Sequence, residues 1–290
     1  MKQALIKLHI SVFLAGFTGV LGKLIDMNEG LLVWYRIMLT VVTLFAWLSW
    51  KKKITRISAS NVWKLLGIGC LIAMHWVCFY GSIKIANVSI GLICFASVGL
   101  FTAILEPMLT TRKLSWAEIG LGLLSLLGIY LIFHFDARFR TGILLGIASA
   151  VLGALFSVLN KKNVDVAEPQ TLMLYELSGG LLILTIGMPL YLYYFPAVSI
   201  LPTWSDWGWL LILSWLCTVY AMDLMLQALK KVSAFTQNLT LNLEPVYGVL
   251  LAFALYNENK DLNTSFYAGF FLIALSVVLQ MLRVVRKKNV

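Results

Sequence analysis

The stretch GLLVWYRIMLTVVTLFAWLSWKKK, residues 30–53, decides the fold class of this chain. Its residues 30–50 hold one charged side chain, that of Arg36, and three lysines follow at positions 51–53. A run of about 20 mainly apolar residues forms a helix that crosses the ~30 Å hydrocarbon core of a bilayer. The stretch therefore predicts a transmembrane helix that ends at a charged loop.

Apolar runs of this length repeat along the whole chain. Of the 290 residues, 60% are apolar and 12% are charged, whereas soluble domains have roughly 45–50% apolar and about 25% charged residues. This composition excludes a water-soluble fold, and the runs lack the two-residue alternation of a membrane barrel. The sequence predicts an all-α polytopic membrane protein with ten transmembrane helices. The predicted spans lie near residues 4–22, 30–50, 62–83, 86–108, 115–134, 142–160, 171–194, 207–228, 233–256 and 264–283.

The distribution of lysine and arginine predicts the orientation of these spans. Most lysine and arginine residues lie in the N-terminal segment, in the loops that follow the second, fourth, sixth and eighth spans, and in the C-terminal segment. By the positive-inside rule, we expect both termini to be cytoplasmic in a multi-pass protein of a cell (inner) membrane. The formal net charge of +10 then faces anionic lipid, so no nucleic-acid partner is expected.

Short similar segments occur in the same order in the two halves of the chain. Residues 19–23 end the first span much as residues 157–161 end the sixth. We expect two five-helix repeats, residues 1–135 and 142–290. Because each repeat has an odd number of spans, the second inserts upside down relative to the first. Many secondary transporters have such inverted repeats and bind the substrate near the membrane midplane between them.

Three long segments, together with residues 228–233 and 267–269, carry a resemblance to a known family. They are LHISVFLAGFTGVLGKL at residues 8–24, GILLGIASAVLGALFSVLNKK at residues 142–162 and LEPVYGVLLAFALYNE at residues 243–258. The last has a proline in the ninth span and an acidic residue after it. Together they resemble the EamA-like family of the drug/metabolite transporter superfamily over nearly the whole chain. The first repeat departs from the pattern, because Ser97 or Val98 stands where a proline is expected.

This resemblance implies two EamA-like repeats and a definite arrangement of the helices. Spans 1–4 and 6–9 would surround a central cavity, and spans 5 and 10 would be peripheral. It also implies a secondary carrier, often an exporter. Such families are functionally broad, so the fold does not name the substrate.

The ninth span opens with many polar residues, within positions 236–244. Polar groups facing lipid are costly, so this face must point to the protein interior. Gln237 and Glu244 share one helical face, and Asn238 and Asn242 form the adjoining stripe. We predict that these four residues bind the substrate or a proton. The alternative is a hydrogen-bond network that only holds the helices together.

Two further ionisable residues lie inside predicted spans. Arg36 in the second span could pair with a substrate carboxylate through two parallel hydrogen bonds. It could equally extend to the interface or pair with a structural carboxylate. Glu176 occupies the corresponding place in the seventh span and is a second candidate for substrate binding. The inversion of the repeats argues against a direct bridge between the two.

Aromatic residues follow a histidine near the middle of the third span. His75, Trp76 and Tyr80 could form a cavity wall that combines hydrogen bonding with aromatic surface. The alternative is a histidine whose hydrogen bonds are satisfied within the protein core. We include all three residues among the candidates for substrate binding.

The leading hypothesis is a secondary transporter that moves a small polar or zwitterionic metabolite, such as an amino acid, by alternating access. Its partners would be that small molecule and the bilayer, with protons as a further candidate. An enzyme is not expected, because the sequence lacks a nucleophile–base motif and a zinc-protease motif. The four cysteines have no metal-site spacing, and no cofactor is expected. The alternative is a lipid-handling or scaffold membrane protein without a polar substrate.

Overall fold

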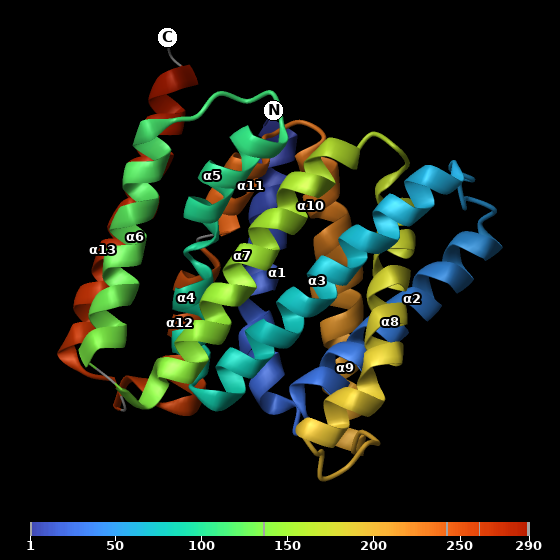
Figure 1. Cartoon of the computed structure of the whole chain (residues 1–290), viewed down its shortest axis with the longest axis horizontal. Coiled ribbons are helices and arrows are strands. Elements are labelled where there is room, and N and C mark those ends of the chain that lie inside the picture. Colours follow the sequence, from blue (N-terminus) through green and yellow to red (C-terminus); the bar gives the residue numbers. More distant parts are fainter. Residues whose placement is uncertain (1, 136, 242, 261, 289–290) are drawn as a thin grey trace.

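The computed structural model describes residues 2–135, 137–241, 243–260 and 262–288, and within these ranges the elements are all helical. The helices form one bundle in which α1 begins and α13 ends at the same end (Figure 1). In chain order they are α1 (Lys2–Leu24), α2 (Glu29–Trp50), α3 (Ala59–Ile85), α4 (Val88–Phe95), α5 (Val98–Leu109), α6 (Trp116–Phe135), η1 (Ala137–Phe139), α7 (Arg140–Asn163), α8 (Pro169–Tyr194), α9 (Trp204–Ser214), η2 (Trp215–Tyr220), α10 (Ala221–Leu229), α11 (Ala234–Leu241), α12 (Glu244–Tyr256), η3 (Glu258–Lys260) and α13 (Thr264–Lys288).

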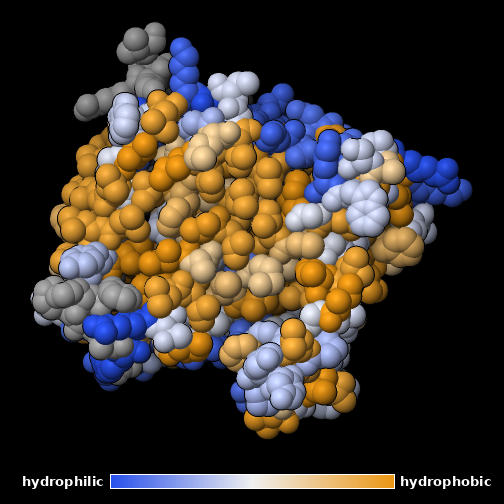
Figure 2. Space-filling view, viewed as in Figure 1, coloured by the Kyte–Doolittle hydropathy of each residue, from blue (hydrophilic) through white to orange (hydrophobic). Residues whose placement is uncertain are grey.

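The all-helical membrane architecture is confirmed, whereas the count of ten spans stays a prediction. Among the described residues, seven helical stretches are long and apolar enough to cross a membrane. Shorter apolar helices, Trp116–Leu131, Glu244–Tyr256 and Thr264–Ser276, lie in the predicted fifth, ninth and tenth spans. On the face shown in Figure 2, apolar side chains cover the middle of the bundle, and hydrophilic ones gather toward its two ends. The chain is therefore a multi-pass membrane protein.

Short polar side chains start several of the helices. The Asn28 side chain accepts from the Gly30 amide at 2.9 Å before α2, and Asn87 accepts from the Ile90 amide at 2.8 Å before α4. These oxygens satisfy amide groups that have no partner within the helix. Such caps fix where each span begins, and with it the depth of the side chains that follow.

The predicted fourth and ninth spans are each divided into two helices. Span 4 breaks between α4 and α5, where the Ser97 hydroxyl donates to the Cys94 carbonyl at 2.7 Å. Span 9 breaks between α11 and α12, where Pro245 lies in the first turn of the new helix. Proline has no amide proton to donate, so it fits the first turn of a helix, where the amide has no partner within the helix. A buried serine takes the corresponding place in the first half.

The predicted eighth span also departs from a regular helix. Residues 215–220 form a π-helix, η2, between α9 and α10. The wider turn of a π-helix shifts the side chains that follow it around the helix axis, and such turns occur frequently at functional sites. Hydropathy does not distinguish this turn from regular helix, so the sequence predicts the span but not its irregular middle.

Small residues allow α3 to pack closely between α7 and α8. An added Cβ at Gly142 of α7 would lie 2.5 Å from the Ala86 Cβ, and one at Gly69 of α3 would lie 1.6 Å from the Glu176 carbonyl oxygen. Contacts of this kind are typical of helix pairs in membranes. Helices α6 and α13 pack against each other at one edge of the bundle (Figure 1). This agrees with the peripheral positions that the resemblance implies for spans 5 and 10.

Candidate functional site

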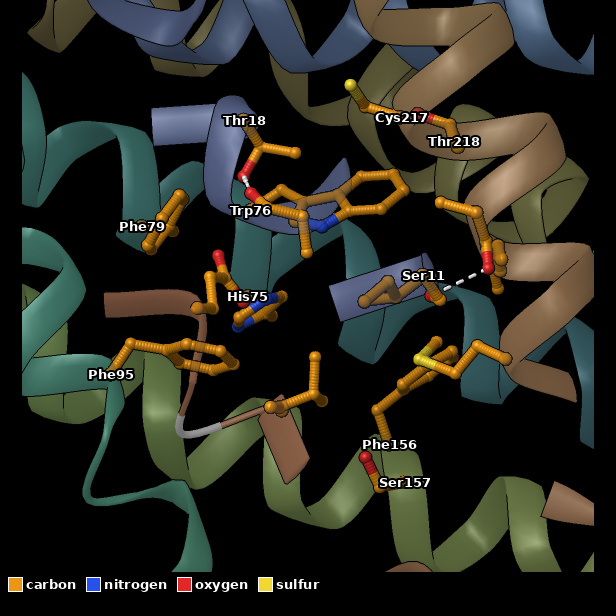
Figure 3. A pocket seen from close by; sticks show the side chains of 18 of the residues that line it. Ser11, Thr18, His75, Trp76, Phe79, Phe95, Phe156, Ser157, Cys217 and Thr218 are labelled. Atoms are coloured by element: carbon orange, nitrogen blue, oxygen red, sulfur yellow. Dashed lines mark hydrogen bonds between the residues drawn. The ribbon is translucent and has the colours of Figure 1, made fainter. Parts of the chain in front are cut away.

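A cavity of about 100 Å3 lies inside the bundle between the two halves of the chain. Figure 3 shows side chains from several helices converging on it. Its polar wall is contributed by Ser11, Thr18, Arg36, His75, Ser157, Thr218, Gln237, Asn238 and Glu244, and its apolar wall includes Trp76, Phe79, Phe95, Phe156, Met222 and Met225. Ligand sites commonly combine a mainly apolar wall with a few polar groups that orient the ligand.

Arg36 of α2 is held in one orientation by three neighbours. Its Nε donates to the Thr218 hydroxyl at 2.8 Å, and one terminal nitrogen donates to the Tyr80 hydroxyl at 2.8 Å. The guanidinium carbon lies 3.7 Å from the ring centroid of Trp76, which places the cation over the aromatic face. A guanidinium has five N–H donors, so donors are left to point into the cavity. Arg36 is therefore a buried side chain held in one orientation rather than a flexible surface charge.

The π-helix explains how Thr218 comes to accept this hydrogen bond. The Thr218 hydroxyl donates to the Leu213 carbonyl five residues earlier, at 2.8 Å. With its proton committed to that carbonyl, the oxygen presents lone pairs to Arg36. Ser214 adds a hydrogen bond from its hydroxyl to the Arg36 carbonyl at 3.2 Å. The irregular turn therefore fixes both the backbone and the guanidinium of Arg36.

Glu244 lies in the first turn of α12, at the break in the ninth span, and only 4% of its surface is exposed. Its side chain lines the same cavity as Thr18 of α1 and Arg36 of α2. No ion pair within 4.0 Å joins Glu244 to Arg36 in the part of the chain that the structure describes. The guanidinium of Arg36 and the carboxyl group of Glu244 therefore line one cavity without a direct ion pair.

A network of neutral polar side chains forms the wall beside α7 and α11. The Ser157 hydroxyl donates to Asn238 Oδ1 at 2.9 Å, and Asn238 Nδ2 donates to the Thr102 hydroxyl at 2.7 Å. Gln237 Nε2 lies 3.5 Å from the Ser157 hydroxyl, and Gln237 Oε1 has no hydrogen-bond partner among the described atoms. An unsatisfied amide oxygen in a cavity wall is available to a ligand donor.

His75 of α3 contributes a ring with a defined hydrogen-bonding partner. Its Nδ1 lies 2.8 Å from the Ser149 carbonyl oxygen and 2.9 Å from the Ser149 hydroxyl, and the carbonyl oxygen, which can only accept, favours the tautomer with a proton on Nδ1. The ring packs against Phe95, with ring centroids 5.0 Å apart (Figure 3). Both interactions orient the imidazole at the cavity wall. They also satisfy one nitrogen within the protein, as the alternative interpretation of the sequence expected.

The structure places most, but not all, of the predicted site residues at this cavity. Six of them line it: Arg36, His75, Trp76, Gln237, Asn238 and Glu244. Tyr80 is fully buried behind Arg36 and reaches the cavity only through that hydrogen bond. Glu176 is buried outside the residues that line the cavity, beside Asn160. Asn242 lies outside the described residues.

Sequence reasoning missed several polar wall residues. Ser11 and Thr18 are two helical turns apart on α1 and are the polar positions of an apolar helix face, a signal that the sequence does contain. Ser157 was not among the predicted site residues, although it faces the cavity. Thr218 had no recognisable signal, because its position depends on the π-helix.

Comparison with known proteins identifies the family. The family model described as the EamA-like transporter family matches residues 3–134 and 140–282, in two halves. The chain belongs to this family. A solved crystal structure is similar over 99% of this chain and 99% of that chain, with a TM-score of 0.70 and 16% sequence identity, a likeness that shows the fold alone. No curated protein matches the sequence.

Membership of the EamA-like family confirms the resemblance and the two-repeat architecture. Members of this family are transporters, not enzymes. A transporter binds its substrate inside the bilayer, and the cavity of this EamA-like chain is a candidate for that site. Within the described residues, no group of three or more His, Cys, Asp and Glu side chains could hold a metal ion.

Proposed function

We propose that this EamA-like chain is a secondary transporter of a small zwitterionic metabolite, such as an amino acid, and that it works by alternating access. The observation that carries the proposal is the placement of Arg36 and Glu244 in one cavity without a direct ion pair. A substrate that carries a carboxylate and an ammonium group can pair with both. The two protein charges then compensate the two substrate charges in a region where an unpaired charge is costly.

The geometry around each charge supports this assignment of roles. Arg36 is held by Thr218 and Tyr80 and presents its remaining donors to a carboxylate. Glu244, with the free amide oxygen of Gln237 in the same wall, offers acceptors to an ammonium group. The rest of the wall is mainly aromatic and methionine side chains, which favours a substrate with an uncharged side chain. The cavity of about 100 Å3 favours a small metabolite over a drug-sized molecule.

The predicted orientation and direction complete the proposal. We infer that both termini face the cytoplasm of a cell (inner) membrane, because the lysine and arginine residues gather on their side. Export is the direction that the resemblance to the family suggests. The repeats 1–135 and 142–290 would then move against each other around the cavity.

Thermal unfolding of the purified protein tests the substrate class, because a ligand that binds only the folded state raises Tm. The panel contains amino acids, their methyl esters, which lack the carboxylate, and their N-acetyl derivatives, which lack the ammonium group. We expect a stabilising shift from zwitterions only. Equal shifts from an amino acid and its methyl ester would contradict the proposal.

Two variants locate the charges that recognise the substrate. Arg36→Gln should remove the preference for the amino acid over its methyl ester. Glu244→Gln should remove the preference for the amino acid over its N-acetyl derivative. Arg56→Gln, at an exposed loop position, is the matched control and should behave as the wild type. Uptake of the same compounds into proteoliposomes then separates binding from transport. A stabilising lipid with no effect from any zwitterion would favour the lipid-handling alternative.

A further inference from the structure

Glu176 is a buried carboxyl group that the substrate cavity does not use. It lies about two turns into α8, none of its surface is exposed, and the backbone of α3 packs against it at Gly69. Its Oε2 accepts from Asn160 Nδ2 at 3.2 Å, and its Oε1 has no hydrogen-bond partner among the described atoms. One amide donor does not satisfy the lone pairs of an ionised carboxylate.

No cation near Glu176 compensates a negative charge in the described part of the chain. Its side-chain hydrogen-bond partner is Asn160, and no ion pair within 4.0 Å joins Glu176 to a basic side chain among the described residues. Lys161 on α7 donates to the Leu229 carbonyl at 2.7 Å, and Arg36 faces the cavity. The ionisable side chains on the nearby parts of the surrounding elements are Tyr35 and Arg36 on α2, Lys64, Cys70 and His75 on α3, Lys161 and Lys162 on α7, Tyr175 on α8 and Asp223 on α10.

Asn160 is suited to both protonation states of a carboxyl group. In the observed orientation its Nδ2 donates to Glu176, which suits the carboxylate, while its own Oδ1 has no partner. The amide oxygen and nitrogen exchange places when the group turns over. Oδ1 then accepts a hydrogen bond from the O–H of the carboxylic acid. The pair can therefore hold a proton or release it and keep one hydrogen bond in either state.

We propose that Glu176 and Asn160 form a proton-binding site, separate from the substrate cavity, and that its proton is the one coupled to transport. In this conformation Glu176 is a carboxylic acid, since an ionised group in the membrane needs a partner that the site lacks. When the helices move apart during transport, water reaches the site, the O–H bond breaks, the proton passes to water and the carboxylate remains. Binding of a proton from water reverses the step.

Helix α7 gives this site a mechanical connection to the substrate. Asn160 lies one helical turn after Ser157, which lines the cavity and bonds Asn238. A rotation of α7 on substrate binding would displace Asn160 as well, and with it the hydrogen bond to Glu176. The coupling half of this inference rests on the proposed transport function, whereas protonation of Glu176 does not depend on it.

Infrared spectroscopy tests the protonation directly, because a carboxylic acid has a C=O stretch that a carboxylate lacks. We expect a carboxylic-acid band at neutral pH that decreases in Glu176→Gln. Glu258→Gln is the matched control, since Glu258 is also buried but pairs with Lys23 at 2.8 Å and should contribute no such band. An unchanged band in Glu176→Gln would overturn the protonation. If that variant does not fold, Asn160→Leu should shift the pH at which the band disappears, and an unshifted band would overturn the pairing.

Proteoliposomes with an imposed pH gradient test the coupling. We expect Glu176→Gln to bind and equilibrate substrate within about twofold of the wild type but to lose gradient-driven accumulation. Asp165→Asn, an exposed carboxylate in the loop between α7 and α8, should keep it. Accumulation by Glu176→Gln equal to that of the wild type would overturn the coupling and leave the transport function intact. If no zwitterion moves in any variant, the transport proposal fails, and the infrared result still decides the protonation of Glu176.

Discussion

Glu106 and Glu258 make the same contacts at opposite ends of the bundle. The Glu106 carboxylate accepts from the amides of Ala234 and Phe235, the first residues of α11, at 3.2 and 3.0 Å. The Glu258 carboxylate accepts from the amides of Val88 and Ser89, the first residues of α4, at 3.2 and 3.0 Å. Glu106 lies near the end of the broken fourth span and caps the ninth. Glu258 follows the broken ninth span and caps the fourth. The two broken spans therefore run antiparallel, with a carboxylate contact at each end.

A basic residue completes each contact. Arg112 lies 2.8 Å from Glu106, and Lys23 lies 2.8 Å from Glu258. Helix N-termini and cations both stabilise carboxylates. Since the cavity lies between these two ends, alternating access requires that one contact loosen at a time.

Sided labelling of Cys217, a cavity-lining residue, tests this arrangement. In a background with Cys70→Ala, Cys78→Ala and Cys94→Ala, we expect Glu106→Gln to increase labelling by a membrane-impermeant thiol reagent from the side where α1 begins. Glu258→Gln should increase it from the opposite side. Each change removes the charge from a buried contact and should destabilise the closed state by roughly 1–3 kcal/mol.

Glu168→Gln is the control for that experiment, because Glu168 is exposed and its ion pair with Lys230 spans 3.7 Å. Such surface pairs contribute little. Equal labelling from both sides in Glu106→Gln and Glu258→Gln would show that these contacts only hold the fold together.

Glu258 should also make stability depend on pH. Burial raises its pKa, but the hydrogen bonds from Lys23 and Ser89 outweigh burial and hold the pKa below its usual value of 4.5. A lowered pKa in the folded state means that the stabilisation is fully present above about pH 4.5 and is lost as the pH falls through the folded-state pKa. Glu258→Gln should lower Tm at pH 7, and its difference from the wild type should shrink below about pH 4. A difference that is constant over this range would contradict the assignment.

Thr218 should determine how well Arg36 binds a carboxylate. Thr218→Val removes the acceptor of the Arg36 Nε hydrogen bond and leaves a buried charged donor unsatisfied. Hydrogen bonds to charged groups contribute about 1.5–3 kcal/mol, so we expect substrate Kd to rise roughly 10- to 100-fold. Thr218→Ser keeps the hydroxyl and should bind within about threefold of the wild type. Calorimetric titration measures both, and equal Kd values for the Val and Ser variants would exclude this role.

The sequence predicted the elements that depend on local pattern and missed those that depend on packing. Runs of apolar residues were sufficient for the all-helical membrane architecture, and the similar segments in the two halves were sufficient for the two-repeat architecture. The polar face with Gln237 and Glu244 was recognisable because lipid would not tolerate it. The break at Ser97 was not recognisable, since a serine breaks a helix only where its hydroxyl can donate a hydrogen bond to a carbonyl. The position of Glu176 outside the cavity likewise follows from its contact with Asn160 and from the close approach of α3. A pattern within a single helix contains neither contact.

The crossing of α3 and α8 should tolerate no side chain at Gly69. A Cβ there would lie 1.6 Å from the Glu176 carbonyl oxygen, a backbone atom that cannot move without shifting the helix. Gly67, on the same helix, has nothing within 4 Å of an added Cβ and is the matched control. We expect Gly69→Ala to lower the free energy of unfolding by roughly 1–3 kcal/mol or more. Gly67→Ala should leave it unchanged or raise it slightly, because alanine favours the helix. Thermal unfolding in detergent measures both variants, and equal stability would mean that the two helices cross less closely than the structure places them.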